Sequence, residues 1–417
     1  MRPALAVAAA AAAAYLPSLA GVFQFDDYNV IVHYPTVHSW QALLERAGGG
    51  VRPLLKASYT LNWTLGGGFH AFNIAAHALN AALLFLVGRA LFRNDAASLV
   101  AALAFALHPA QAEAVTYVSG RSSSLMASFY LGALLAYLRG AHWSVSSLLF
   151  VLAVATRETA VTLPAALLLC ELCRPERAGW REILRRQRAH WALLAAGALL
   201  LLANERYFEL IAYGFGERGL AENLLTQVGG VSYLVLRLVS LHGYNIDPAL
   251  PTLTQWTPAL ALQAGLLAAL FAVGVASLRR RPWIAFGVLW FFLQLAPTNS
   301  IVPRLDVAND RQLYLACWGL FIALCVQLGS LPRPATAIVL ALLAIASISR
   351  QLDYRSEIAL WESSVRLAPW NARGHNNLGY AYQLAGRTEA ARREYRAALV
   401  FDPRHAKARL NLMFLGG

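Results

Sequence analysis

The first 350 residues repeat one pattern, an apolar segment followed by a short polar or basic stretch. Such segments occur at 3–23, 72–91, 96–107, 123–138, 143–156, 159–173, 191–203, 257–278, 283–297, 312–329 and 335–349. A soluble globule is excluded, because 58% of the residues are hydrophobic and only 14% are charged. Since a helix satisfies its own backbone polar groups in lipid, the pattern predicts an all-α, polytopic membrane bundle of about 11 spans. We expect 3–23 to be retained as the first span, because further apolar segments follow it.

The distribution of arginine predicts how the bundle faces. Basic residues collect in cytoplasmic loops, and the stretch 174–190 alone carries six arginines. With this stretch inside, 226–242 cannot cross, and we expect a re-entrant or interfacial helix within a long outer loop, 204–256. The N-terminus is then cytoplasmic and the C-terminus lies outside. Abundant alanine and scarce lysine indicate a bacterium, so we predict a multi-pass protein of the inner membrane. The net charge of +13 is explained by these loops and does not indicate a nucleic-acid partner.

Residues 372–405 match the signature of a 34-residue tetratricopeptide repeat. The matching positions are Leu378, Gly379, Tyr382, Ala391, Tyr395, Ala398 and Pro403. Half a repeat precedes this unit, and 406–414 has the pattern of a further helix. We therefore divide the chain into a membrane domain, 1–350, and a repeat domain on the outer side, 351–417. Such repeats present a groove and no chemistry, so the tail is predicted to bind protein.

Two adjacent carboxylates, Asp26 and Asp27, follow the first apolar segment. Ionisable groups at a membrane boundary are costly unless they are solvated, paired or used. One interpretation is a general base or a cation ligand at the bilayer surface. The other is a pair of helix-capping residues in a wet loop.

Other polar residues stand within or beside the apolar segments. His70, Asn73, His77 and Asn80 share one face of a helix, which predicts either hydrogen bonds across helices or the wall of a cavity. Metal binding by His70 and His77 is not expected, because seven residues separate them. Pro109 ends another segment, just before Glu113.

Three arginines, Arg121, Arg157 and Arg311, lie near the outer ends of apolar segments. Arginine is the residue expected where an anionic headgroup is held at the membrane boundary. Ion pairs offer another explanation, between Arg121 and Glu113 or between Arg157 and Glu158. Together with the acids, the arginines fit a phosphate-bearing lipid substrate.

Motifs in a fixed order resemble a known family. They are Phe25-Asp26-Asp27-Tyr28, Arg52-Pro53-Leu54, Phe69-His70 with Asn73 and His77, His108-Pro109 with Glu113-Ala114-Val115, Gly120-Arg121, Arg157-Glu158-Thr159, and Asp310-Arg311 with Leu313-Tyr314-Leu315. With the repeat, they resemble the transmembrane and tetratricopeptide-repeat O-mannosyltransferases of the GT-C glycosyltransferase superfamily. The resemblance covers nearly the whole chain.

The resemblance implies a GT-C bundle that takes a sugar from a polyprenyl phosphate. Asp26 would match the acid that activates the acceptor hydroxyl, with Asp27 beside it. Arg311 and Arg157, then Arg121, would bind the leaving lipid phosphate. The cavity and acceptor residues would be Glu113, His108, His77, Asn73 and Arg52. The resemblance implies neither a metal nor another cofactor.

Three hypotheses remain at this point. The first is an inverting glycosyltransferase that moves a sugar, with mannose as one candidate, from a polyprenyl phosphate to a Ser or Thr hydroxyl of an exported protein held by the repeats. The second is an oligosaccharyltransferase that uses a polyprenyl-pyrophosphate glycan and a divalent metal held by Asp26, Asp27 and Glu113. The third is a membrane scaffold that recruits partners through its repeats and does no chemistry.

Overall fold

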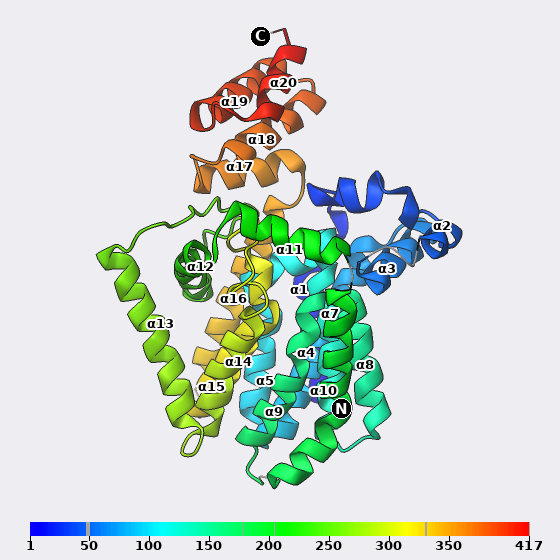
Figure 1. Cartoon of the computed structure of the whole chain (residues 1–417), viewed down its shortest axis with the longest axis vertical. Coiled ribbons are helices and arrows are strands. Elements are labelled where there is room, and N and C mark those ends of the chain that lie inside the picture. Colours follow the sequence, from blue (N-terminus) through cyan, green and yellow to red (C-terminus); the bar gives the residue numbers. More distant parts are fainter. Residues whose placement is uncertain (47–50, 177, 204, 330–331, 417) are drawn as a thin grey trace.

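The computed structural model describes residues 1–46, 51–176, 178–203, 205–329 and 332–416. In these ranges the chain forms helices and loops, with no strand. Figure 1 shows a bundle of long helices with the C-terminal helices stacked on one end, while the N-terminus lies toward the other end. We call the end that carries the C-terminal helices the tail end of the bundle.

Four helices of the described ranges are long and apolar enough to cross a membrane alone. They are α4 (Phe69–Phe92), α13 (Pro258–Ser277), α15 with its preceding turn (Asp310–Leu328) and α16 (Arg333–Asp353). A fifth candidate joins α5 (Asp95–Leu107) to the segment Pro109–Val115 across a 55° bend. Proline causes this break, because it has no N–H to continue the helix. Only 11% of the most apolar 18-residue stretch of α13 is buried in the protein. Lipid must cover the rest, so the chain is a membrane protein.

The other apolar segments form shorter helices. They are α1 (Arg2–Ala14), α7 (Arg121–Leu138), α8 (Trp143–Thr156), α9 (Leu163–Cys173), α10 (Trp180–Leu202) and α14 (Pro282–Leu295). The first predicted segment, 3–23, is not one continuous helix, because α1 ends at Ala14 and a 3₁₀ turn, Leu16–Ala20, follows. Pro17 accounts for the break, since it lacks the N–H that an α-helix needs there.

Close helix contacts hold the bundle together. In lipid, the hydrophobic effect does not bring helices together. Small residues stabilise helix pairs there, because they let the two backbones pack closely. Gly287 of α14 faces Gly319 of α15, and a Cβ at Gly319 would lie 2.6 Å from Cδ1 of Trp290. Trp290 and Trp318 are fully buried beside this contact, with their ring centroids 5.6 Å apart. These residues fix how α14 packs on α15.

Four helices cover the tail end of the bundle. They are α2 (Trp40–Glu45), α3 (Pro53–Thr64), α11 (Glu205–Glu217) and α12 (Leu220–Ser240). Figure 1 shows α12 nearly end-on while the long helices run vertically, so its axis crosses theirs. The helix contains most of the segment 226–242 and begins before it.

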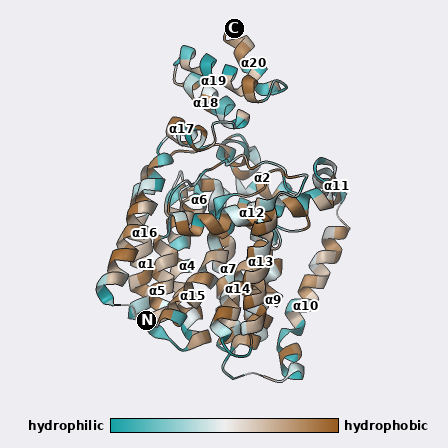
Figure 2. Cartoon of the chain, turned by 90° about the vertical axis from the view of Figure 1, so that its left-hand side faces the viewer, coloured by the Kyte–Doolittle hydropathy of each residue, from teal (hydrophilic) through white to brown (hydrophobic). Residues whose placement is uncertain are grey.

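The C-terminal helices are α17 (Glu357–Leu367), α18 (Ala372–Leu384), α19 (Thr388–Phe401) and α20 (Ala406–Phe414). Helices α18 and α19 pack closely at Gly379. A Cβ at this position would lie only 2.7 Å from Tyr395 Cδ1. Figure 2 shows that these helices carry more hydrophilic residues than the bundle. A shared apolar cluster, which includes Tyr117, Ile246 and Trp361, joins them to the bundle.

Candidate active site

Asp27 anchors the loop that follows α1. Its side chain is fully buried, and its carboxylate accepts hydrogen bonds from the Gln24 N–H (3.0 Å), the Ser119 N–H (2.7 Å) and the Ser119 hydroxyl. Burial raises the pKa of Asp27 to about 7, although these donors oppose the shift. Asp27 therefore ties the loop to the turn at Val118–Gly120 and has its oxygens occupied.

Asp26 is the half-buried member of the pair. Its N–H donates to the Tyr117 hydroxyl at 2.9 Å. Burial raises the pKa of the Asp26 carboxyl, and the positive charge of Arg311 opposes that shift. The carboxylate is thus accessible, close to a cation, and better suited than Asp27 to receive a proton.

The residue before Asp26 has an unusual backbone. Phe25 has a φ of 47°, a left-handed conformation that side chains other than glycine rarely adopt. The first residue of α17 holds it there, because the Phe25 N–H donates to Glu357 Oε1 at 3.1 Å. The Phe25 ring also packs edge-on against Trp361, with ring centroids 5.2 Å apart. Sequence analysis missed this link between the tail and the loop, since nothing local in the sequence marks it.

Glu357→Ala is expected to slow the proposed reaction about fivefold, because the strained Phe25 backbone loses a hydrogen bond worth about 1 kcal/mol. Glu357→Gln keeps an acceptor oxygen and should restore most of the rate. The measurement is the turnover of detergent-purified variants over a range of donor concentrations, with the loss falling on kcat. Equal losses in both variants would contradict a positioning role for this oxygen.

Four arginines from distant parts of the chain lie close to one another: Arg52, Arg157, Arg304 and Arg311. Two of them have carboxylate partners. Arg52 donates to Glu158, with Nε 2.8 Å from Oε2. Burial raises the pKa of Glu158, but this pair outweighs it and lowers the pKa to about 2.

Arg311 is held by Glu113, as two contacts show. The Arg311 N–H donates to Glu113 Oε2 at 3.1 Å, and Arg311 Nε lies 3.5 Å from Oε1. Glu113 is 3% exposed, so this pairing fixes the start of α15 against the bent segment Pro109–Val115. Glu113 thus positions Arg311, although it was expected to line the cavity itself.

In the part of the chain that the structure describes, the other two arginines have no carboxylate partner. Arg157 is 5% exposed, and its side chain donates to the hydroxyls of Ser122 (3.4 Å) and Ser123. Its Nε is buried without a partner. Within the described ranges, the guanidinium of Arg304 makes no hydrogen bond or ion pair. The expected Arg157–Glu158 pair is replaced by Arg52–Glu158.

Arg157 and Arg311 line one narrow pocket between the bundle helices. The remaining lining residues are Ser123, Met126, Thr159, Gln294, Thr298, Gln312, Tyr314 and Leu315. A buried guanidinium with an unused donor is costly unless an anion compensates it. The four arginines therefore concentrate positive charge around Arg311, and the charge of Arg311 also acts on Asp26. Arg304 was missed because it lies in a loop without a motif.

Arg121, predicted to bind the donor phosphate, makes hydrogen bonds within the protein. Arg121 is fully buried and donates to Asn73 Oδ1 (2.7 Å), the Ser58 carbonyl (3.0 Å) and the Phe69 carbonyl (2.9 Å). Asn73 in turn donates to the carbonyls of Val115, Tyr117 and Val118. These bonds use the donors inside the protein, so Arg121 and Asn73 tie helices together, and Asn73 does not face a cavity.

His77 and His108 also have structural roles in place of the expected cavity positions. His77 Nδ1 lies 2.9 Å from the Tyr314 hydroxyl, and Nε2 lies 3.1 Å from the Ala106 carbonyl. His108 Nδ1 accepts from the Ala110 N–H at 3.2 Å and caps the turn after α5. Both rings are buried and bonded within the protein.

The ligand set of the metal-dependent hypothesis does not fit this arrangement. In the described part of the chain, no three His, Cys, Asp or Glu side chains form a metal-binding group. Protein donors occupy the oxygens of Asp27, and Glu113 is bonded to Arg311. Of the three proposed ligands, Asp26 is half-buried, and its side chain interacts with the Tyr117 hydroxyl.

Comparison with known proteins shows what the chain is similar to. No protein-family model matches it. It is 24% identical to a protein O-mannosyl-transferase of Caenorhabditis elegans over 93% of this chain and 61% of the relative. It is 25% identical to protein O-mannosyl-transferase TMTC4 of Mus musculus over 90% of this chain and 63% of the relative. The chain is thus similar to TMTC protein O-mannosyl-transferases over most of its length. Identity to Tmtc1 of Drosophila melanogaster reaches 35%, over 38% of this chain.

The chain spans about three fifths of the length of the TMTC relatives from Caenorhabditis elegans and Mus musculus. The alignments with these relatives therefore cover nearly all of this chain but only part of each relative.

Proposed function

We propose that this chain is an inverting GT-C glycosyltransferase that moves a sugar, with mannose as the first candidate, from a polyprenyl phosphate to a Ser or Thr hydroxyl of an exported protein. One observation carries the proposal: the charge of Arg311, which belongs to a cluster of four arginines, acts on an accessible carboxylate, Asp26. A carboxylate receives the hydroxyl proton, and cations receive the charge of a leaving phosphate. The names of the TMTC relatives support this reaction and the choice of sugar.

The proposed reaction is a single displacement. The acceptor hydroxyl oxygen forms a bond to the anomeric carbon while Asp26 takes its proton. The bond between that carbon and the lipid-phosphate oxygen breaks, and its electron pair leaves with the phosphate. Arg311 and Arg157 stabilise the developing charge. Attack from the side opposite the phosphate inverts the anomeric configuration.

We also propose an orientation and a compartment. A GT-C membrane domain of about 11 spans, residues 1–350, lies in the cytoplasmic membrane of a bacterium with the start of α1 inside. Residues 351–417 form a tetratricopeptide-repeat domain outside, where the exported acceptor is bound. The signature spacing and the close packing of α18 on α19 support the repeat.

Reporter fusions test the orientation. Alkaline phosphatase fused after residue 350 should be active, and a cytosolic fluorescent protein fused there should be dark. The reason is the high density of arginine at the end of the bundle opposite the tail, in residues 174–190. A fusion within 174–190 is the matched control and should behave in the opposite way. A fluorescent tail fusion would overturn both the orientation and the number of spans.

A transfer assay tests the reaction and its metal dependence. Purified protein, polyprenyl-phosphate mannose and an acceptor peptide should give mannosylated peptide by intact mass, and EDTA should not change the rate. The arginine cluster provides the charge that a metal would otherwise supply. Transfer from a pyrophosphate-linked glycan that EDTA abolishes would favour the oligosaccharyltransferase. Comparing exported glycoproteins with and without the gene would identify the sugar and acceptor.

A further inference from the structure

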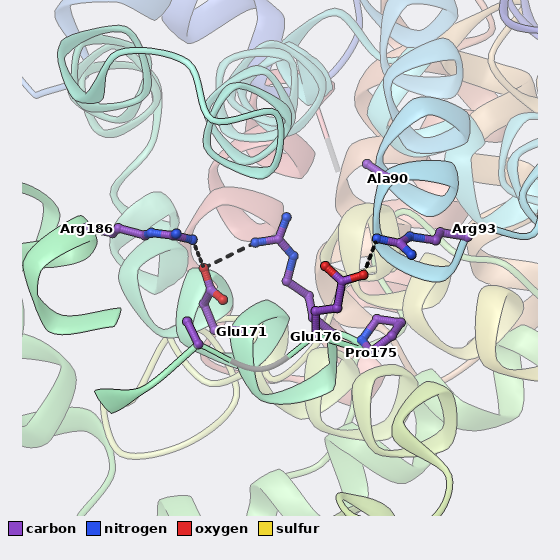
Figure 3. A pocket seen from close by; sticks show the side chains of 8 residues that line it. Ala90, Arg93, Glu171, Pro175, Glu176 and Arg186 are labelled. Carbon is purple, nitrogen blue, oxygen red and sulfur yellow. Dashed lines mark hydrogen bonds and ion pairs between the residues drawn. The ribbon is translucent and has the colours of Figure 1, made fainter. Parts of the chain in front are cut away.

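A second group of arginines lies at the end of the bundle opposite the tail. Arg139, Arg174 and Arg186 line one surface pocket there, where α7 ends and α10 begins. The other lining residues are Tyr137, Leu138, Gly140, Ala141, Trp143, Ser146 and His190. Arg174 and Arg186 also line an adjoining pocket, shown in Figure 3. This group belongs to neither the Asp26 site nor the reaction proposed for it.

One buried carboxylate organises two of these arginines. Glu171 is 1% exposed, and its Oε1 accepts from the Tyr137 hydroxyl at 2.8 Å. The same oxygen lies 3.4 Å from Arg174 Nη1 and 3.7 Å from Arg186 Nη1, and Figure 3 shows Arg186 pointing toward Glu171. The other oxygen of Glu171 is buried without a partner. The two guanidiniums are therefore held in place before any ligand arrives.

The pocket has more positive than negative charge. Arg174 and Arg186 together carry two positive charges, and the single negative charge of Glu171 balances one of them. Arg186 and Arg185 both pair with Glu182, whose one negative charge they share. In the described ranges, the Arg139 guanidinium has no hydrogen bond or ion pair. Three arginines line the pocket and two carboxylates partner them, so at least one positive charge is left for an anion.

The surroundings indicate a lipid as the source of that anion. Trp143, 57% exposed, opens α8 at the rim of the pocket, and tryptophan is enriched where a membrane meets water. Beyond it, α8 exposes Val145, Leu148 and Val151, an apolar face suited to acyl chains. A headgroup in the pocket would place its chains along this face. The proposed orientation puts the pocket in the cytoplasmic leaflet, where anionic lipids attract basic residues.

We propose that this pocket binds the phosphate of an anionic phospholipid, with Arg139, Arg174 and Arg186 as its donors. The lipid bridges the ends of α7, α9 and α10 and stabilises that end of the bundle. The site is separate from the Asp26 site, and its occupancy does not depend on whether the chain transfers sugar.

Native mass spectrometry of the full chain, titrated with phosphatidylglycerol or with phosphatidylcholine, tests this proposal. Wild type should retain phosphatidylglycerol preferentially. The triple variant Arg139→Gln/Arg174→Gln/Arg186→Gln should bind it at least about tenfold more weakly. Arg139→Gln alone should weaken binding about threefold. Because Arg139 is exposed, this single variant should fold and keeps the test valid if the triple variant misfolds.

The matched control is Arg279→Gln/Arg280→Gln/Arg281→Gln, which removes three charges from the loop between α13 and α14. This control should retain phosphatidylglycerol as wild type does. Equal retention by all variants, or an equal loss in the control, would overturn the site. Millimolar inorganic phosphate should not displace the lipid. If it does so completely, the site binds free phosphate and the lipid assignment is wrong.

Discussion

Asp26→Asn is expected to reduce sugar transfer by roughly 10²–10⁴-fold while the protein folds and inserts normally. Asparagine keeps the shape of the side chain but cannot take the proton of the acceptor hydroxyl. The half-buried position of Asp26 lets the change occur without disrupting the buried bonds of Asp27. Single-turnover transfer, with donor affinity measured separately, is the appropriate assay, and donor affinity should change little.

The pH dependence of transfer offers an independent check on Asp26. Burial raises the pKa of its carboxyl above the usual aspartate value, despite the charge of Arg311. A general base must be ionised, so wild-type transfer should fall as the pH decreases through this raised pKa. In Asp26→Asn this limb of the pH profile should disappear from the residual rate.

Two variants serve as controls for Asp26→Asn. Glu45→Gln neutralises an exposed acid at the end of α2 and should leave the rate unchanged. Asp27→Asn should instead lower the yield and thermal stability of folded protein, because an amide would place a donor against the N–H of Gln24 or of Ser119. A near-normal rate for Asp26→Asn would remove it from the reaction and leave the scaffold hypothesis ahead.

Arg311→Ala is expected to weaken use of the lipid donor by about ten- to a hundredfold, as the loss of a hydrogen bond between charged groups implies. Arg311→Lys should lose less, because one positive charge remains beside the pocket that Arg311 lines with Arg157. The dependence of the initial transfer rate on donor concentration measures the difference.

The ion pair between Arg311 and Glu113 requires its own control. Arg311→Ala leaves a buried carboxylate without its partner, which would lower stability for reasons unrelated to the donor. Arg311→Ala/Glu113→Gln removes that charge and should keep the donor defect while regaining stability. Arg355→Ala, at an exposed arginine near the tail, should behave as wild type. Wild-type donor dependence in both Arg311 variants would show that Arg311 only pairs with acids.

The helical membrane class could be predicted from the sequence, because hydrocarbon leaves a chain few alternatives and the apolar segments are local features. The similarity to protein O-mannosyl-transferases was also predictable, since the shared motifs are short and ordered along the chain. The break at Pro17 could not be predicted from hydropathy. A hydropathy pattern does not report where a backbone hydrogen bond is missing.

The roles of the polar residues were decided only by the tertiary structure. A polar stripe on an apolar helix predicts an inward-facing side chain, but not which neighbour uses its donors. Asn73 and Arg121 satisfy each other and nearby carbonyls, so neither is left for a substrate. Arg157 has the same charge as Arg121, but its Nε is buried without a hydrogen-bond partner, which suits the phosphate contact that we propose.

The contact between the tail and the catalytic loop likewise depends on the tertiary structure. Phe25 and Glu357 are separated by most of the chain, yet their hydrogen bond holds the backbone beside Asp26. The sequence by itself determined the membrane helices, the acidic pair and the basic loops, because local composition governs them. Only three-dimensional packing decided which carboxylate is accessible and which arginines lack a partner, because hydrogen bonds and burial arise between segments distant in sequence.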